Sequence, residues 1–530
     1  MSESSLDAGT SPADDLADAE HRRRPLFAAA DQLRFAGGGT AAPYAVAAEI
    51  GEHRHGERSR AQALGHLTRL AAREQPSIAL AGLREALGQG LDDRSRSTLL
   101  AMVAAIAART GHPDADALLR DAGTAHAAAG DNSSARHLAL ARAARSLSHG
   151  DLPGADAVLA ALDPDAWVAR PEATSIRAER ILVHLGLGRH QDARSATAAD
   201  ETASPDILMS GRLTALDGLR MVAVGELPEA GALAVTTLGS GSTDLGAEVR
   251  ALLVAVIAEV HYRRGDHDAA RAVLRGCLRE RRWPDSTMWT PAFCVAVRDP
   301  ALREPARLLD RVVADLHRSV RSLLPVPQFG PRLVRAAMAV GDARAARRVT
   351  ELVELVATRT PVPLWHALAA QTRGLRDRDP DALRSAVDGL RTTAARPALA
   401  DALLDLANTP RLRPTEAWDA AHEAAALYAR IGAPGDQATA DRRCVELAAT
   451  PRHRPPVDGA PRTGIGALTP AEERVAEVLA AGATKKEAAG TLFVSFHTVD
   501  TQLRSIYHKL GIHNRMQLVR AWDRYKARIG

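Results

Sequence analysis

Residues 260–274 read VHYRRGDHDAARAVL. Helix-favouring residues lie on both sides of Gly265, and glycine commonly ends a helix because it adopts the left-handed backbone conformation without strain. Asp266 favours the start of a new helix, and Ala270 is small enough to let two antiparallel helices approach closely. The stretch therefore predicts a helical hairpin.

The same turn recurs along the chain at a nearly constant interval. Five of these turn glycines follow one another at intervals of 39, 38, 37 and 40 residues: Gly111, Gly150, Gly188, Gly225 and Gly265. Gly341 follows 76 residues later, which is two such intervals. A small residue lies five positions after most of them: Ala155, Ala193, Ala230, Ala270 and Ala346. A period near 38 residues predicts an α-solenoid of stacked hairpins, which resembles tetratricopeptide-type repeats with a longer period and an incomplete consensus. The alternative is that any alanine-rich helical array places glycine turns at about this spacing.

The composition favours an all-α fold. The chain has 530 residues, too many for one compact core, and only 3% of them are aromatic. Its apolar residues are mainly Ala and Leu, which favour helices over strands. Three cysteines, Cys277, Cys294 and Cys444, have no paired spacing, which argues against disulfides and cysteine-rich zinc sites. We expect no cofactor.

Two segments bear on the cellular compartment. Residues 1–20 are acidic and lack the basic start and apolar stretch of a signal peptide. The most apolar run, residues 251–260, has about half the length of a membrane span and contains Glu259. We therefore expect a buried helix over this run, no membrane segment, and a cytoplasmic, nucleoid-associated protein.

Four regions are expected along the chain. They are a disordered tail over residues 1–25, the solenoid over 26–448, a Pro- and Gly-rich linker over 449–467, and a helical domain over 468–530. All four lysines lie in the last region, which holds ten basic and six acidic residues. That region therefore carries the whole net charge of +4, as expected of a domain that binds a polyanion.

The last region contains start and stop signals for four helices. TPAE at 469–472 and TKKE at 484–487 are capping boxes, Ser495 and Asn514 are placed to cap two further helices, and glycines end the first and third. The third helix has one apolar stripe, Val499, Leu503, Ile506 and Leu510, and an opposite polar side, His497, Asp500, Thr501, Arg504 and His508. A short helix, a tight turn and a longer helix with a polar outer face form the helix-turn-helix pattern, whose second helix fits the DNA major groove.

The segment from Leu468 to Trp522 closely resembles the LuxR-type helix-turn-helix family of bacterial transcription regulators. The resemblance is ungapped and covers about 60 of the 530 residues. The matching residues include Leu468, Thr469, Glu472, Val475, Leu479, Gly482, Lys486, Glu487, Ala489, Leu492, Ser495, Thr498, Val499, Ile506, Lys509, Leu510, Gly511 and Arg515.

The resemblance implies which residues contact DNA. Asp500, Thr501 and Arg504 are expected to face the bases, with Arg504 donating to a guanine edge and Asp500 accepting from a cytosine amine. The residues expected to contact phosphates are Lys485, Lys486, Thr498 and Lys509, together with Arg504. For Lys485 and Lys486 the alternative is an ordinary exposed helix start. Glu472 and Arg515 match positions that are expected to pair and brace the fold.

Three residues depart from the family pattern. Asp500 stands where a basic residue or Glu is common, which leaves the preferred operator open. Ala488 replaces a larger aliphatic residue and Gly490 lies inside a short helix, and each is expected to cost roughly 1 kcal/mol of stability. We therefore expect the domain to be marginally stable alone.

The last helix carries more apolar surface than a four-helix core needs. By the resemblance it forms a homodimer contact through Leu518, Val519, Trp522 and Tyr525. Two-fold pairing would match an inverted-repeat operator. The alternative is that these residues pack in the core of their own domain.

No enzymatic module is expected. Large ATP-dependent LuxR regulators carry a P-loop whose lysine reaches the nucleotide phosphates, but no lysine precedes Lys485 in this chain. Residues 410–449 resemble the end of the helical array in those regulators. The resemblance implies that the chain is a relative of these regulators that has the helical array and the DNA-binding domain but lacks the ATPase. An isolated H-x-H at His53 and His55 is too little for a metal site.

These expectations combine into one function. The chain is expected to be a sequence-specific transcription regulator that binds promoter DNA as a dimer, while the solenoid senses a protein or small-molecule effector. RNA polymerase is a further expected partner. The alternative is a solenoid scaffold for protein interactions with only weak nucleic-acid binding.

Overall fold

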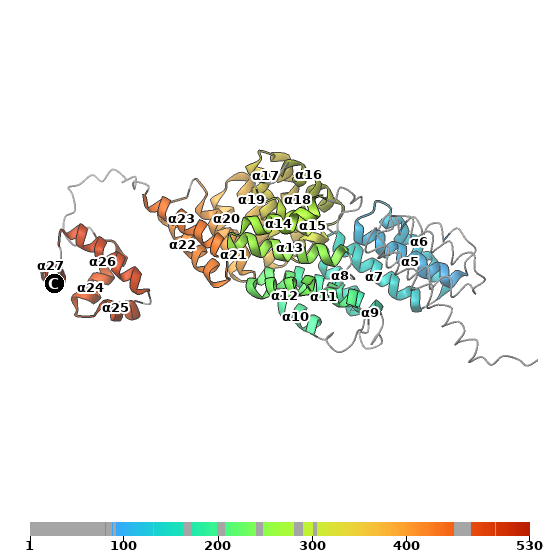
Figure 1. The fold of residues 1–530 in the computed structure, drawn as a ribbon, viewed down its shortest axis with the longest axis horizontal. Coiled ribbons are helices and arrows are strands. Elements are labelled where there is room, and N and C mark those ends of the chain that lie inside the picture. The colour runs from blue at the N-terminus through green and yellow to red at the C-terminus, as the bar shows by residue number, and fades with distance from the viewer. Residues whose placement is uncertain are drawn as a thin grey trace, which may run out of the picture. The chain divides into compact units, whose positions relative to one another are not determined.

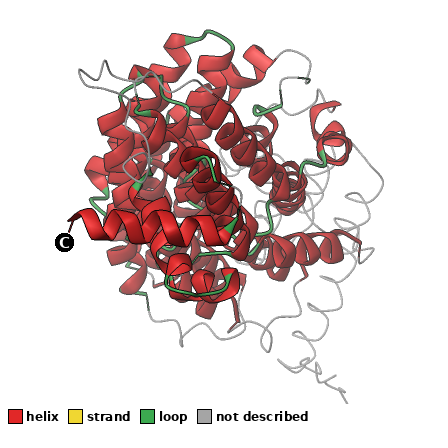
Figure 2. Cartoon of the chain, turned by 90° about the vertical axis from the view of Figure 1, so that its left-hand side faces the viewer, coloured by secondary structure: helices red, strands yellow, loops and turns green. Residues whose placement is uncertain are grey.

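The computed structural model describes Leu80, Leu87 and residues 92–130, 132–162, 171–198, 207–239, 247–279, 290–299, 301, 305–410, 412–449, 468–492, 494–512 and 514–529. Within these ranges every regular element is a helix, and Figure 2 shows helices joined by loops without a strand. The all-α fold class is confirmed. The predicted tail, the predicted linker beyond Ala449, and His53 and His55 lie outside the described residues.

The chain divides into two compact units, of which the first ends at Thr450. The described residues of its first half, from residue 92 on, form helical hairpins that follow one another (Figure 1). They are α5 (Asp93–Thr110) with α6 (Ala115–Ala129), α7 (Asn132–Ser148) with α8 (Leu152–Ala160), α9 (Pro171–Gly186) with α10 (His190–Ala198), α11 (Ile207–Val224) with α12 (Leu227–Gly239), and α13 (Ala247–Arg264) with α14 (His267–Arg279). The second half holds α15 (Thr290–Ala296), α16 (Pro305–Arg318), the 3-10 helix η3 (Val320–Leu323), α17 (Phe329–Ala339), α18 (Ala343–Arg359), α19 (Pro363–Asp377), α20 (Pro380–Arg391), α21 (Arg396–Ala407), α22 (Pro414–Arg430) and α23 (Pro434–Ala449).

The hairpin turns occur where the glycine spacing predicts them. All six glycines have a positive φ, from 65° at Gly111 to 94° at Gly225, and the five alanines that follow are fully buried. Arg378 makes a further turn of the same kind, with φ 55°, between α19 and α20 and 37 residues after Gly341. The glycine pattern missed this turn because a non-glycine residue occupies its left-handed position.

Turns in the first half of the array pack directly against helices of the second half. Thr360, which follows α18, accepts a hydrogen bond from the Leu152 N–H at 3.1 Å and donates one to the Gly150 carbonyl at 2.8 Å. Trp365 of α19 donates its indole N–H to the Gly186 carbonyl at 2.8 Å. Contacts between segments about 200 residues apart therefore hold the array together, in addition to the contacts between neighbouring hairpins.

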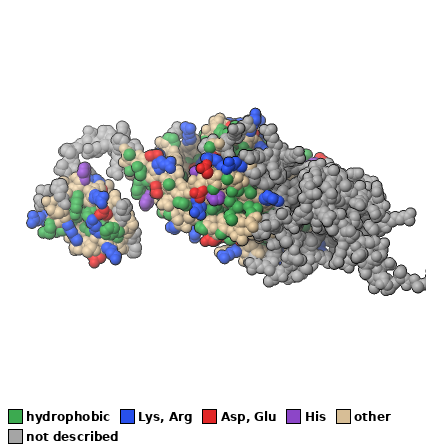
Figure 3. Space-filling view, viewed as in Figure 1, with side chains coloured by type: hydrophobic (Ala, Val, Ile, Leu, Met, Phe, Trp, Pro, Cys, Tyr) green, Lys and Arg blue, Asp and Glu red, His purple; other side chains and the backbone are tan. Residues whose placement is uncertain are grey.

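The apolar run 251–260 lies inside α13 and is buried throughout, as predicted, including Glu259 at 1% exposure. The Glu259 carboxylate accepts hydrogen bonds of 2.6–2.7 Å from Arg263 and from Arg332 of α17. Arg263 also donates to Asp401 of α21 and Asp436 of α23. These charges tolerate burial because each has an opposite charge at hydrogen-bonding distance. Acidic and basic side chains are also interspersed on the face of the array shown in Figure 3.

The second unit begins at Pro451, and its described residues form four helices. They are α24 (Pro470–Ala480), α25 (Lys485–Thr491), α26 (Phe496–Leu510) and α27 (Arg515–Ile529), the four that the capping signals predict. In neither unit does the described part of the chain include a helix with the length and apolar character needed to cross a membrane.

Candidate nucleic-acid interface

Local hydrogen bonds set the start of each helix in the second unit. The motifs at 469–472 and 484–487 are capping boxes in which threonine and glutamate exchange two hydrogen bonds. Ser495 begins α26 by accepting the backbone N–H of Thr498, and Asn514 accepts a backbone N–H at the start of α27. The predicted caps are confirmed, and they leave only a short turn between α25 and α26.

The predicted apolar stripe of α26 forms the centre of the domain core. Val499, Leu503 and Ile506 are at most 7% exposed, and Leu510 is half-buried. They pack with residues of the other three helices, which include Val475, Leu479, Ala488, Leu518 and Trp522. On the opposite side Thr501, Arg504 and His508 are exposed, while the side chain of His497 lies outside the described residues. One face of α26 is thus held by the core and the other is open to a ligand.

Asp500 is the centre of a charged group at the start of this open face. Its carboxylate accepts a hydrogen bond of 2.6 Å from the Lys485 ammonium of α25 and lies 2.8 Å from Nη2 of Arg504. The side chains of Asp500, Lys485 and Arg504 are 19%, 42% and 82% exposed. Asp500 therefore ties α25 to α26 and restrains Arg504, whose guanidinium has five N–H donors and commits only one end to this pair.

Glu472 forms a second charged group, which braces α24 against α26. It accepts hydrogen bonds from the Lys509 ammonium and, at 2.6 Å, from the Ser505 hydroxyl. Burial by itself would raise the pKa of Glu472, but these bonds and that from the Thr469 N–H outweigh it and lower the pKa to about 2. Lys509, expected to contact phosphate, is one-quarter exposed and holds Glu472 in the absence of DNA. Its phosphate contact stays a prediction.

The predicted pairing of Glu472 with Arg515 is wrong, because Arg515 has different partners. Its guanidinium donates to the carbonyls of Leu479 at 2.9 Å and Ala483 at 2.8 Å. Leu479 lies in the last turn of α24, where backbone acceptors lack partners within the helix and a basic side chain is favourable, and Ala483 lies in the turn that follows. Arg515 thus braces the fold by capping α24 rather than by pairing with the carboxylate.

The remaining phosphate candidates lie in the first turns of α25 and α26. Lys486 is exposed at the start of α25, and Thr498 is half-buried with its hydroxyl 2.7 Å from the Ser495 hydroxyl. Lys485 contacts Asp500 of α26, so the structure brings this phosphate candidate to the base-contact candidates of α26, and the phosphate contacts themselves stay predictions.

The predicted dimer contact on α27 needs a correction. Leu518 is fully buried and Trp522 is 5% exposed, and both pack in the core of their own domain. They leave almost no surface for a partner. For these two residues the structure therefore agrees with the alternative, packing in the core of their own domain. Val519 is half-buried, and the side chain of Tyr525 lies outside the described residues. Among the described side chains of α27, Met516 is a large apolar one that is exposed to solvent, at 67%.

One exposed aromatic residue was missed by the sequence reasoning. Phe496, the first residue of α26, is 56% exposed, and Val494 before it is 38% exposed. Phe496 lies three residues before Val499 and would extend the buried stripe, so periodicity would place it in the core. Its position directly after the cap residue Ser495 is the only signal that it lies at the helix end, next to the open face.

Comparisons with known proteins agree with this geometry. Residues 466–522 match the family model described as bacterial regulatory proteins, luxR family. Three relatives, one from Mycobacterium bovis and two from Mycobacterium tuberculosis, are provisionally named HTH-type transcriptional regulators and are 46% identical over 59 residues. That segment is 11% of this chain and 7% of each relative. A solved circular tandem repeat protein with novel repeat topology is similar at 16% identity over 80% of this chain and 96% of its own, but a TM-score of 0.13 supports no conclusion about fold.

Proposed function

We propose that this chain, whose residues 466–522 form a LuxR-type helix-turn-helix domain, is a sequence-specific DNA-binding transcriptional regulator. The observation that carries the proposal is the open face of α26, where Arg504 is 82% exposed and restrained by Asp500. A restrained guanidinium loses little conformational freedom when it forms two hydrogen bonds to a guanine edge.

Neighbouring side chains complete the proposed interface. Thr501 faces the same side of α26, and the exposed ring of Phe496 can contact a thymine methyl group. Lys485, Lys486 and Thr498 supply phosphate contacts, which set affinity and register rather than sequence. In this proposal Asp500 orients Arg504 and Lys485, and it reads a cytosine amine only where DNA displaces one of these cations.

The test begins with selection of duplexes from a random library by the full-length chain, followed by binding titrations on a selected and a scrambled duplex. Arg504→Ala is expected to weaken binding to the selected duplex by about 1–3 kcal/mol. The difference in affinity between the selected and the scrambled duplex is expected to become smaller. Arg474→Ala, which removes an exposed arginine from α24, is the matched control. Two outcomes would favour the scaffold alternative, in which nucleic-acid binding is weak and unspecific. One is that the selected duplexes share no common sequence, and the other is that Arg504→Ala and Arg474→Ala lose the same amount of binding affinity.

We further propose roles for the other regions. The array over 26–448 senses an effector, the linker over 449–467 tethers the DNA-binding domain, and the protein acts in the cytoplasm at the nucleoid with RNA polymerase as a partner. Dimerisation on an inverted repeat would use the outer face of α27, with Met516 and Val519 at the contact. Met516→Glu is expected to abolish a dimer in analytical ultracentrifugation on operator DNA. An unchanged stoichiometry would rule out this face.

A further inference from the structure

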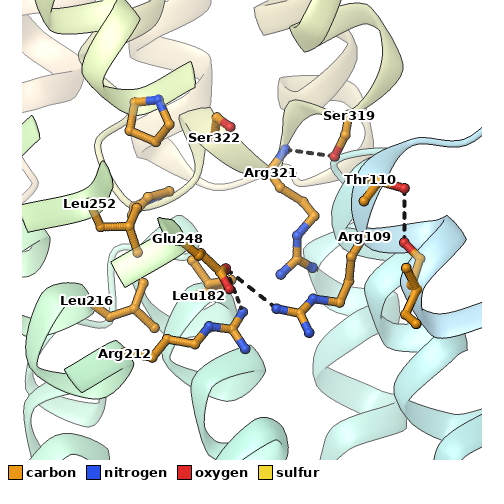
Figure 4. Close-up of a pocket in the computed structure, with 13 residues that line it drawn as sticks. Arg109, Thr110, Leu182, Arg212, Leu216, Glu248, Leu252, Ser319, Arg321 and Ser322 are labelled. Carbon is orange, nitrogen blue, oxygen red and sulfur yellow. Dashed lines mark hydrogen bonds and ion pairs between the residues drawn. The ribbon is translucent and has the colours of Figure 1, made fainter. Parts of the chain in front are cut away.

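A cavity of about 100 Å³ lies inside the helical array (Figure 4). Its wall is formed by α5, α9, α11, α13 and α15, together with η3 and the residues around it. Figure 4 shows the side chains of Arg109, Arg212 and Arg321 converging on the same space, with Glu248 beside them. Elements more than 200 residues apart in the sequence thus contribute to one small chamber, whose lining combines these charged side chains with apolar ones.

The charges around this chamber do not balance. Arg321 lies 2.7 Å from the Glu179 carboxylate behind the wall, Arg212 lies 3.4 Å from it and Arg109 3.6 Å. Arg212 and Arg109 each lie 3.5 Å from Glu248. Among the described residues, three guanidinium groups share these two carboxylates, which leaves one positive charge in excess. Burial and the neighbouring Arg212 lower the pKa of Arg109 to about 10, as expected where positive charge is crowded.

The side chain of Arg212 on the wall has a buried donor without a hydrogen-bond partner. The Arg212 side chain is 7% exposed, and its Nε has no hydrogen-bond acceptor. Buried polar groups in folded proteins almost always have a hydrogen-bond partner, and leaving one unmade is costly. A ligand that brings acceptor oxygens into the chamber would supply the missing partner of Arg212 Nε.

The other buried charged cluster of the same array shows what a purely structural arrangement looks like. It contains four arginines and four carboxylates: Arg263, Arg298, Arg332 and Arg335 with Glu259, Asp401, Asp405 and Asp436. Its charges cancel, and its short contacts link one helix directly to the next. The chamber at Arg109, Arg212 and Arg321 departs from that pattern in both charge and open volume.

We propose that this chamber binds the oxyanion group, a carboxylate or phosphate, of a small metabolite. Arginine presents paired donors that match the oxygens of both groups, and the volume exceeds what a single water molecule needs. The bound molecule is the effector that the array senses, a role that rests on the proposed regulatory function. The arginines that would bind this molecule belong to α5, α11 and η3. A bound molecule would therefore join helices that are far apart in the chain.

The test uses isothermal titration of the full-length chain, without DNA, with inorganic phosphate and with succinate at ionic strength matched by sodium chloride. One of the two anions is expected to give saturable one-site binding, which also identifies the preferred oxyanion. Arg109→Gln is expected to weaken that binding at least tenfold, since Glu179 keeps two other arginines and the fold is retained. Arg373→Gln, which removes an exposed arginine paired with Glu354, is expected to bind as the unaltered chain does.

A second variant acts in the opposite direction and does not depend on the stability of the first. Glu248→Gln removes a competing carboxylate from the wall and is expected to tighten anion binding several-fold. Saturable binding of neither anion, or equal affinities for the unaltered chain and both variants, would overturn the site. These titrations contain no DNA, so a failure of the proposed DNA recognition leaves them unaffected. If the anion binds but leaves duplex affinity unchanged, the effector role is refuted and the binding site stands.

Discussion

The brace between α24 and α26 allows a stability prediction whose size follows from the structure. Glu472, whose side chain is 9% exposed, has its pKa lowered from 4.5 to about 2 by Lys509, Ser505 and Thr469 against the opposing effect of burial. Since one pKa unit corresponds to about 1.4 kcal/mol, the ionised carboxylate stabilises the second unit by about 3 kcal/mol. Glu472→Gln removes this charge and leaves Lys509 without its partner, so we expect a loss of about that size.

The same shift predicts a pH dependence. The folded-state pKa of Glu472 is depressed, so its stabilisation is complete above the unfolded-state value of about 4.5 and is lost as the pH falls toward about 2. At pH 3.5 the unaltered chain should have lost about 1 kcal/mol of this contribution, whereas Glu472→Gln should show no such loss from this position.

Hydrogen exchange of the full-length chain measures the effect locally. The buried amides of α24 and α26 should exchange about a hundredfold faster in Glu472→Gln at pH 7. Glu477→Gln, an exposed change on the same helix, should leave exchange unaltered. In the double variant with Lys509→Met, the loss should be smaller than the sum of the two single losses. Exchange of Glu472→Gln within twofold of the unaltered chain would refute the brace.

Three further predictions concern DNA binding, the α27 core and the array. Asp500→Asn removes the carboxylate that pairs with two basic side chains, so it should raise affinity for the scrambled duplex and steepen the dependence of log affinity on log salt by up to about 0.9, while the lost orientation of Arg504 should reduce the preference for the selected duplex; an unchanged slope in anisotropy titrations would contradict this. Trp522→Ala should destabilise the second unit by about 3–5 kcal/mol at every protein concentration, whereas a role only in dimerisation would give a concentration-dependent effect. Gly150→Ala should cost about 1 kcal/mol through its φ of 75° and about 1–3 kcal/mol more because its Cβ would lie 2.7 Å from Val356 Cγ2. Gly130→Ala is the control, because Gly130 also has a positive φ but a Cβ there would meet no atom within 4 Å. If urea unfolding shows the same loss of stability for Gly150→Ala and Gly130→Ala, the clash with Val356 is excluded.

The exposed and buried sides of α26 illustrate what could be predicted about the site. The 4, 3 and 4 spacing of its apolar stripe placed the core side correctly, and Thr501 and Arg504 lie on the open side as a consequence. The prediction for α27 was wrong at Leu518 and Trp522, because an apolar residue on a helix face is buried in the same way by its own domain or by a partner. Only the packed structure distinguishes these two cases.

The sequence alone predicted the glycine turns of the array and the four helices of the second unit. Capping boxes, left-handed glycines and apolar periodicity act over four residues or fewer, so their effect on the backbone can be read directly from neighbouring letters. The packing of turns against helices some 200 residues away, the partners of Glu472 and Arg515, and the convergence of Arg109, Arg212 and Arg321 came only from the tertiary structure. An arginine has the same local signature on a solvated helix face as in a buried chamber, because its partners belong to segments that only folding brings together.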